Sequence, residues 1–297
     1  GNTGRQLRAR RFVDFTEFRP RDDDRMPTER APLADLRDPN GAESPFDGKL
    51  AWVEGWLNTP ARLFATNRTG GVGFAVQDDS GGIFVVSDRV DKIYVAVPVG
   101  DEARVCQRAQ DCAAGEACSP LAVCQAVTGL DSLREGVRVR VIARVQEANG
   151  RLRLSDLNFD EQLMVEIMAA GGEGFPAERL FEPELLTVTD FLRRGELQEG
   201  VLTRIAGLHL ASADQKLPLS GRGGTFRVGD EENLALDIGV ERYACETDGE
   251  GGEQCVNRDD MSLPPAGYAG DREWNAFAFD VIGVGDQATS GGGSGKR

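Results

Sequence analysis

Cysteines are the residues of this chain whose chemistry is most evident. One group recurs every six residues at Cys106, Cys112, Cys118 and Cys124, and the second group is the pair Cys245 and Cys255. Both groups lie in polar segments that bury little apolar surface, and disulfides stabilise such segments by restricting the unfolded chain. We therefore expect disulfides, an oxidising compartment and an extracytoplasmic location.

A zinc site is the alternative use of four cysteines. Structural zinc sites usually take pairs of ligands about two to four residues apart. The repeated C-x5-C spacing offers no such pair. The spacing favours disulfides and leaves the pairing of the four cysteines open.

Carboxylates between the last two cysteines form a weaker candidate site. Asp248, Glu250 and Glu253 offer oxygens of the kind that Ca²⁺ accepts. They lack the regular spacing and the closing glutamate of an EF-hand loop. A solvated turn inside a Cys245–Cys255 bridge is the preferred interpretation, and we expect no metal and no other cofactor.

Catalytic patterns are missing from the sequence. The one histidine, His209, lies between two leucines in a strand-like segment, which favours a structural role. The chain has no G-x-S-x-G turn and no phosphate-binding G-x-x-x-x-G-K-[ST] loop. Because no set of nucleophile, base and orienting group can be named, we predict a protein that is not an enzyme.

Alternating apolar and polar residues predict strands in the first half of the chain. The expected strands are 50–57, 73–77, 83–86, 136–145 and 151–154. Tight turns at Asp78 to Gly82 and at Asn149-Gly150 make two hairpins of the last four. One strand, a hairpin, an insertion and a second hairpin follow the order of a five-stranded OB barrel.

A family resemblance supports that fold. Residues 53–55, 74–85 and 135–139, with the phrase Q-D-x-S-G-G-I-x-V beginning at Gln77, resemble OB-fold domains of secreted bacterial proteins, including accessory domains of extracellular nucleases. The segment from Cys106 to Cys124 resembles short cysteine-rich modules of envelope lipoproteins of myxobacterial type. The resemblance implies a tandem OB-fold protein of the cell envelope.

The predicted fold is all-β, with two OB-like five-stranded Greek-key barrels and a disulfide-rich loop insertion in the first. The second barrel repeats a first strand, a hairpin and a fourth strand but lacks a fifth, so it stays open or another segment closes it. The expected organisation is an arm at 1–45, a domain at 46–168 with its insert at 104–126, a linker at 169–182, a domain at 183–287 and a Gly/Ser-rich tail at 288–297.

An OB barrel normally binds ligands on the outer face of its second and third strands. The candidate ligand residues are Arg62, Arg68, Phe74, Phe84, Arg89 and Tyr94. Phe74 and Phe84 suit a place in the core equally well. The net charge of -15 opposes binding to nucleic acid.

The N-terminal arm is the candidate assembly element. Its apolar residues Phe12, Val13, Phe15 and Phe18 alternate in part with polar ones, as an edge strand would. Added to an open barrel of the same or a neighbouring molecule, this strand would cover an exposed edge. The expected function is protein–protein contact in the envelope or outside the cell, with self-assembly as a structural subunit. A nucleic-acid- or glycan-binding module accessory to a secreted nuclease is the alternative.

Overall fold

The computed structural model describes residues 30–37, 44–61, 64–65, 71–87, 93–97, 104–118, 123–148, 151–156, 163–168, 177–211, 224–230, 235–240, 245–247, 253–255 and 278–285. None of the helices within these ranges is long and apolar enough to cross a membrane.

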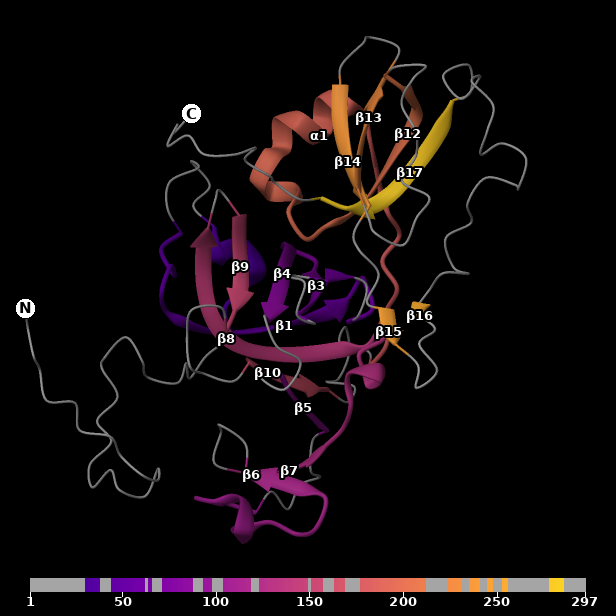
Figure 1. Ribbon diagram of the computed structural model, residues 1–297. Coiled ribbons are helices and arrows are strands. Elements are labelled where there is room, and N and C mark those ends of the chain that lie inside the picture. Colours follow the sequence, from indigo (N-terminus) through magenta and orange to yellow (C-terminus); the bar gives the residue numbers. More distant parts are fainter. Residues whose placement is uncertain are drawn as a thin grey trace, which may run out of the picture.

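Five strands close into the first barrel (Figure 1). They are β1 (Leu50–Leu57), β3 (Val72–Asp78), β4 (Gly81–Ser87), β9 (Arg151–Ser155) and β8 (Arg138–Ala148). In this spatial order β4 and β9 are parallel, the other neighbours are antiparallel, and β8 pairs back onto β1. This is the strand order of an OB barrel, so the predicted fold is confirmed.

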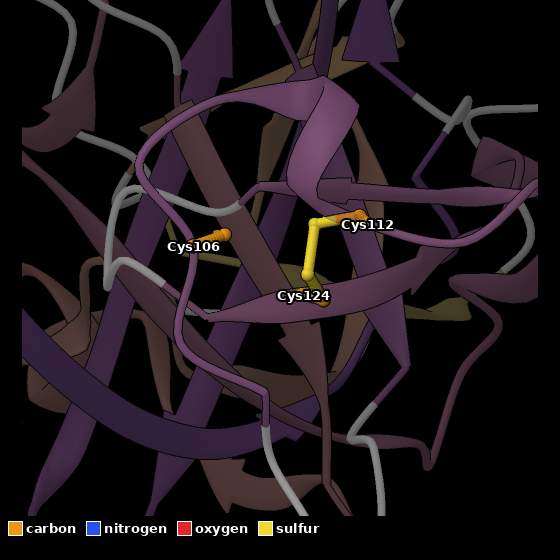
Figure 2. A group of neighbouring side chains, drawn as sticks. All are labelled: Cys106, Cys112 and Cys124. Atoms are coloured by element: carbon orange, nitrogen blue, oxygen red, sulfur yellow. A yellow bond between two sulfur atoms is a disulfide. The ribbon is translucent and has the colours of Figure 1, made fainter.

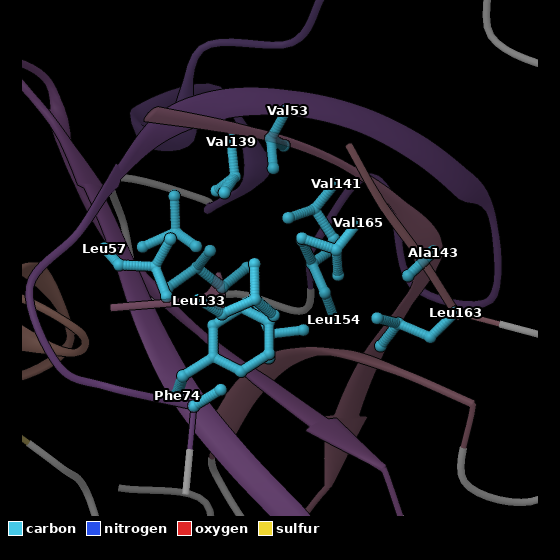
Figure 3. Packing of buried hydrophobic residues seen from close by; sticks show 14 of the residues in the cluster. Val53, Leu57, Phe74, Leu133, Val139, Val141, Ala143, Leu154, Leu163 and Val165 are labelled. Carbon is cyan, nitrogen blue, oxygen red and sulfur yellow. The ribbon is translucent and has the colours of Figure 1, made fainter. Parts of the chain in front are cut away.

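Alternate residues of these strands point inward and form the barrel core (Figure 3). Val53, Phe74, Val139, Val141 and Leu154 are all fully buried there. The period of two explains why the residues between them face outward. The β3–β4 turn is fixed by Asp78, whose Oδ1 accepts hydrogen bonds from the amides of Ser80 and Gly81 at 2.7 and 3.1 Å.

Short 3-10 helices cover parts of the barrel. Leu33 and Leu36 of η3 (Leu33–Leu36) are fully buried in the barrel core. η6 (Leu130–Ser132) lies in the connection that leads to β8 and buries Leu130. A helix in that connection is a common feature of OB barrels, although here it is a single turn.

Four further strands extend the barrel sheet, and the last two of them belong to the cysteine insert. Antiparallel to β8 runs β10 (Leu163–Ile167), followed by β5 (Ile93–Val97), β7 (Cys124–Val127) and β6 (Glu116–Cys118). The β10–β5 pair is parallel. A two-residue strand, β2 (Phe64–Ala65), pairs with β3, and η5 (Ala109–Asp111) precedes β6. Figure 1 shows β6 and β7 at the end of the molecule opposite the second sheet.

The second part of the chain forms a smaller sheet. Its elements are β11 (Glu184–Leu186), α1 (Val188–Arg194), η7 (Gly195–Gln198), β12 (Leu202–Leu210), β13 (Gly224–Gly229), β14 (Ala235–Val240) and β17 (Phe279–Val284). β12 pairs with β11, β13 and β17, and β14 pairs with β13. Within the described ranges no strand joins β14 to β17.

The core of this sheet gathers Val188, Ile205, Leu208, Leu210 and Val228. The helix α1 begins beside this core and contributes Val188 to it. Thr187 caps it, because its hydroxyl accepts a hydrogen bond from the Asp190 amide at 3.0 Å.

A separate two-stranded hairpin pairs β15 (Cys245–Thr247) with β16 (Glu253–Cys255). Cys245 lies opposite Cys255 in its register. Their side chains, and those of the predicted calcium loop Asp248, Glu250 and Glu253, lie outside the described residues.

Candidate functional site

Two side-chain amides on the first barrel hold the backbone that leads into β12. Asn58 Nδ2 donates to the Gly200 carbonyl at 2.7 Å and to Gln77 Oε1 at 2.9 Å. Gln77 Oε1 also accepts from the Leu202 amide at 2.9 Å. All these groups are buried, so the amides satisfy backbone groups that water does not reach.

Two glycines allow the close approach at this junction. A Cβ on Gly82 of β4 would lie 2.1 Å from the Gly200 carbonyl oxygen, and a Cβ on Gly200 would lie 2.2 Å from the Ile83 amide nitrogen. Gly200 also has a φ of 74°, which disfavours other residues. The contact is therefore backbone against backbone and has no room for a side chain.

Glu199 adds a buried charge to the same junction. Its side chain is 2% exposed, and Oε2 lies 3.6 Å from Arg37 Nη2. The Leu152 amide donates to Oε2 at 3.3 Å, and Arg37 donates to the Glu199 carbonyl at 3.1 Å. We name the set Arg37, Asn58, Gln77, Gly82, Leu152 and Glu199–Leu202 the polar junction.

A strap at residues 177–183 runs along the barrel beside the junction. The Arg179 guanidinium lies 4.4 Å from the Phe181 ring centre and 5.1 Å from that of Trp56. It also donates to Asp79 Oδ1 at 2.7 Å. This hydrogen bond lowers the pKa of Asp79. The Arg179 amide donates to the Gly136 carbonyl at 2.8 Å, which ties the strap to the barrel.

A second polar cluster lies on the outer face of β1, β8 and β10. Glu54 accepts from Arg138 at 2.8 Å and from Arg140 at 3.0 Å, and Arg140 also donates to Glu166 at 2.9 Å. The Arg140 guanidinium lies 4.4 Å from the centre of the Trp52 ring. We name these five residues the ion cluster.

The two carboxylates of the ion cluster have opposite pKa shifts. Burial acts to raise the pKa of Glu54, but hydrogen bonds and charges from Arg140 and Arg138 outweigh it, so the pKa falls below the ordinary value. Burial raises the pKa of Glu166, and its contacts with Arg140 and with Gln125, at 2.7 Å, offset this only in part. Opposite shifts are typical of acid–base pairs, yet arginines engage both carboxylates, which suits a structural network better.

The insertion carries two disulfides, Cys106–Cys118 and Cys112–Cys124. The expectation of disulfides in this group is confirmed, and the pairing that the sequence left open is first with third and second with fourth. The sulfur atoms of Cys106, Cys112 and Cys124 lie within 4.8 Å of one another (Figure 2). Disulfides indicate that the folded chain belongs in an oxidising environment.

The three predicted ligand residues that the structure describes, Phe74, Phe84 and Tyr94, do not lie on one face. Phe74 was wrongly placed among them, because alternation along β3 turns it into the core with no exposed surface. Tyr94 lies on β5, beyond the barrel, and its hydroxyl donates to the Ala117 carbonyl of the cysteine insert at 3.2 Å. Phe84 alone faces outward from β4, half-buried. Arg62, Arg68 and Arg89 lie outside the described residues.

Of the other predicted residues, the structure describes His209 but not those of the N-terminal arm. The arm residues Phe12, Val13, Phe15 and Phe18 lie outside the described parts of the chain. His209 lies in β12 opposite Gly229, half-buried, in the strand that the sequence predicts.

The polar junction was not predicted from the sequence. Its glycine, Gly82, was assigned to the β3–β4 turn, and Gln77 and Asn58 gave no periodic signal. The one available hint was a Gly-Gly pair that extends into a strand, since glycine inside a strand often marks a close backbone approach.

The described part of the chain also has a shallow depression of about 360 Å³ beside η6. Its lining mixes charged and apolar side chains, among them Arg134, Glu178, Ile167 and Met168. An ion pair between Arg134 and Glu178 lies across it. It has no converging set of groups that would hold a substrate.

No family model matches the chain, and no curated protein matches it. Solved structures that resemble it include a chain of a replication protein A heterotrimer bound to single-stranded DNA, with 14% identity, a TM-score of 0.25 and coverage of 69% of this chain and 41% of that one. Another comes from work on the abrogation of activation of pro-inflammatory cytokines, with 14% identity, a TM-score of 0.30 and coverage of 65% and 77%. The chain thus spans about two fifths of the replication protein chain. Neither likeness bears on function, and the OB assignment rests on the strand order of the barrel.

Proposed function

We propose that this chain is a non-enzymatic extracytoplasmic protein that acts through protein–protein contacts and associates with further copies of itself. One observation carries the proposal. The outer face of β3 and β4, where OB barrels normally bind ligands, is engaged by the backbone of the chain's own residues 199–202.

The chemistry of that face suits polypeptide. Outward positions of β3 and β4 carry Gly73, Ala75, Gln77, Gly82, Phe84 and Val86, with one aromatic side chain among them. Binding of single-stranded nucleic acid relies on several stacking side chains and on a basic groove. Amides that hold carbonyl and N–H groups, and glycines that admit a backbone, instead favour contact with a protein chain.

The distribution of charge also favours a protein partner over a polyanion. Arg138 and Arg140 are engaged by Glu54 and Glu166, and Arg179 is engaged by Asp79. The chain as a whole carries a net charge of -15. A polyanion would have to displace these carboxylates against the summed field.

A candidate contact surface lies on the second sheet. Eight large apolar residues are exposed in the described parts of the chain, and five of them are at 180–197 or at position 282. Leu185 and Ile282 lie on either side of Arg204 in one cross-strand row, with exposures of 66% and 59%. Exposed apolar side chains that cluster are typical of protein contact sites.

Light scattering coupled to size-exclusion chromatography over a range of protein concentrations tests the proposal. The samples are the full chain, a chain without residues 1–20, and the double variant Leu185→Ser/Ile282→Ser. The matched control is Val105→Ser, which removes an 80% exposed side chain from the cysteine insert.

We expect the average mass of the full chain and of the control to rise with concentration, and that rise to be lost in the truncated or the double variant. A full chain that stays monomeric at every concentration contradicts self-association. Binding of single-stranded DNA or of a glycan by that monomer would support the alternative of a module accessory to a secreted nuclease.

A further inference from the structure

The cysteine insert holds its four cysteines together by backbone contacts as well as by disulfides. In the β6–β7 ladder Cys118 lies opposite Cys124. Val105 forms a bridge with Val123, and the Cys124 amide donates to the Arg104 carbonyl at 2.8 Å. These contacts, besides the disulfides, place the segment of Cys106 beside the hairpin.

Cys112 is held by a separate set of hydrogen bonds. Asp111 Oδ2 accepts from the amides of Gln107 and Arg108, each at 2.9 Å, and so fixes the turn before Cys112. After Cys112, the Ala113 amide donates to Glu116 Oε2 at 3.0 Å and the Glu116 amide donates to the Ala113 carbonyl at 3.0 Å. The turn that carries Cys112 is therefore fastened to the start of β6.

The resulting sulfur positions approach those of a metal–thiolate site. The sulfur atoms of Cys106, Cys112 and Cys124 come within 4.8 Å of one another. A tetrahedral zinc site with bonds of about 2.3 Å places its thiolates about 3.8 Å apart. Cys106 and Cys124 are 2% and 0% exposed, which is the closed environment of a structural site. The Cys112 and Cys124 sulfur atoms are joined at 2.09 Å in the disulfide, so after reduction they would separate by about 1.7 Å, while Cys106 would move closer by up to about 1 Å.

We propose that the reduced insert binds one zinc-like divalent ion through Cys106, Cys112 and Cys124, with Cys118 in the fourth position. An added phosphine or dithiol supplies two electrons to each disulfide, two protons complete each thiol pair, and the reductant is oxidised. The four thiols then release their protons as the metal–sulfur bonds form. The disulfide form and the metal form exclude each other because they use the same sulfur atoms.

The C-x5-C spacing does not exclude a metal site in this fold. C-x5-C supplies no local pair of ligands, but here a hairpin, a bridge and a capped turn supply the cysteines from separate segments. The metal form belongs to the chain before oxidation or after reduction. It is independent of the proposed self-association, so failure of either leaves the other standing.

Cobalt titration of the full chain tests the proposal. The chain is reduced with a phosphine without oxygen in a Cys245→Ser/Cys255→Ser background, which removes the other two thiols. Co²⁺ is then added, and the sulfur-to-cobalt charge-transfer band and the visible bands of tetrahedral cobalt are recorded. We expect one Co²⁺ per chain, displacement by Zn²⁺, and no bands from the oxidised chain.

Variants separate a built site from loose chelation. Cys106→Ser and Cys124→Ser should each weaken Co²⁺ binding tenfold or more, and Cys118→Ser should weaken it less, because water can take the fourth position. Asp111→Ala keeps all four cysteines but removes the acceptor that fixes the turn, and it should also weaken binding. Circular dichroism verifies that the barrel stays folded in each variant. Absence of the bands, or equal binding by the Asp111→Ala and unaltered chains, would overturn the proposal.

Discussion

Gly82→Ala gives the sharpest test of the polar junction. The new Cβ would lie 2.1 Å from the carbonyl oxygen of Gly200, and that oxygen belongs to a backbone that cannot rotate away. The two segments must separate by about 1 Å, which lengthens the Asn58–Gly200 and Gln77–Leu202 hydrogen bonds beyond useful range. Losing two buried hydrogen bonds at about 1 to 2 kcal/mol each lowers the free energy of unfolding by roughly 2 to 4 kcal/mol.

Gly81→Ala is the matched control, because a Cβ on that neighbouring glycine meets nothing within 4 Å. Urea denaturation followed by tryptophan fluorescence and by circular dichroism measures both variants. We expect the free energy of unfolding of Gly82→Ala to be well below that of Gly81→Ala. If the second sheet separates from the barrel, the fluorescence and circular dichroism transitions of Gly82→Ala should no longer coincide. Free energies of unfolding that agree within about 0.5 kcal/mol for the two variants would refute the backbone contact between Gly82 and Gly200.

Three further predictions concern the ion cluster, the core and the disulfides. Glu54→Gln removes the carboxylate that accepts from both Arg138 and Arg140, although Arg140 keeps its contact with Glu166, and should cost roughly 2 to 4 kcal/mol in urea denaturation at pH 7, whereas Glu166→Gln should cost less because burial already disfavours that charge. Since the pKa of Glu54 is lowered, its contribution is present above the ordinary value of 4.5 and is lost as pH falls through the folded value, so Glu54→Gln should flatten the acid side of the stability profile. The pKa of Glu166 is raised, which has the opposite effect, so Glu166→Gln should steepen the acid side of the stability profile. Equal profiles for Glu54→Gln and Glu166→Gln would contradict these two pKa shifts. Phe74→Ala should cost roughly 3 to 5 kcal/mol by the same assay and Phe84→Ala clearly less, and the reverse order would mean that β3 has the other register. Peptide mapping of the oxidised chain should find Cys106 joined to Cys118 and Cys112 to Cys124, and reduction should raise hydrogen exchange at 104–127 while the barrel strands stay protected.

The alternation of apolar and polar residues predicted the barrel because four of its strands form hairpins between segments that are close in sequence. The runs 73–77 and 83–86 meet across a turn whose residues fix the register, and the pair 136–145 and 151–154 does the same. The strands β5 and β10 were not predicted. They pair in parallel across a long stretch of chain, and no local pattern shows which distant segment will lie beside them.

The candidate site was harder to predict for a related reason. The alternating pattern does not determine whether Phe74 points into the barrel or outward, and its direction follows from how the barrel core packs. Asn58, Gln77 and Gly200 belong to segments far apart in the sequence, so their contact follows from how the two sheets pack. Cysteine pairing likewise depends on the β6–β7 register, which spacing alone does not set.

The β3–β4 face, where OB barrels normally bind ligands, is the part of the molecule on which the proposed function depends most. Fluorescence anisotropy of labelled single-stranded DNA and of a labelled oligosaccharide, titrated with the full chain at low and high salt, tests that function directly. We expect no saturable binding of either probe at any salt concentration. Saturable DNA binding that weakens steeply with salt and is lost in Phe84→Ala would contradict the proposed function, because the β3–β4 face would then be open to a nucleic acid.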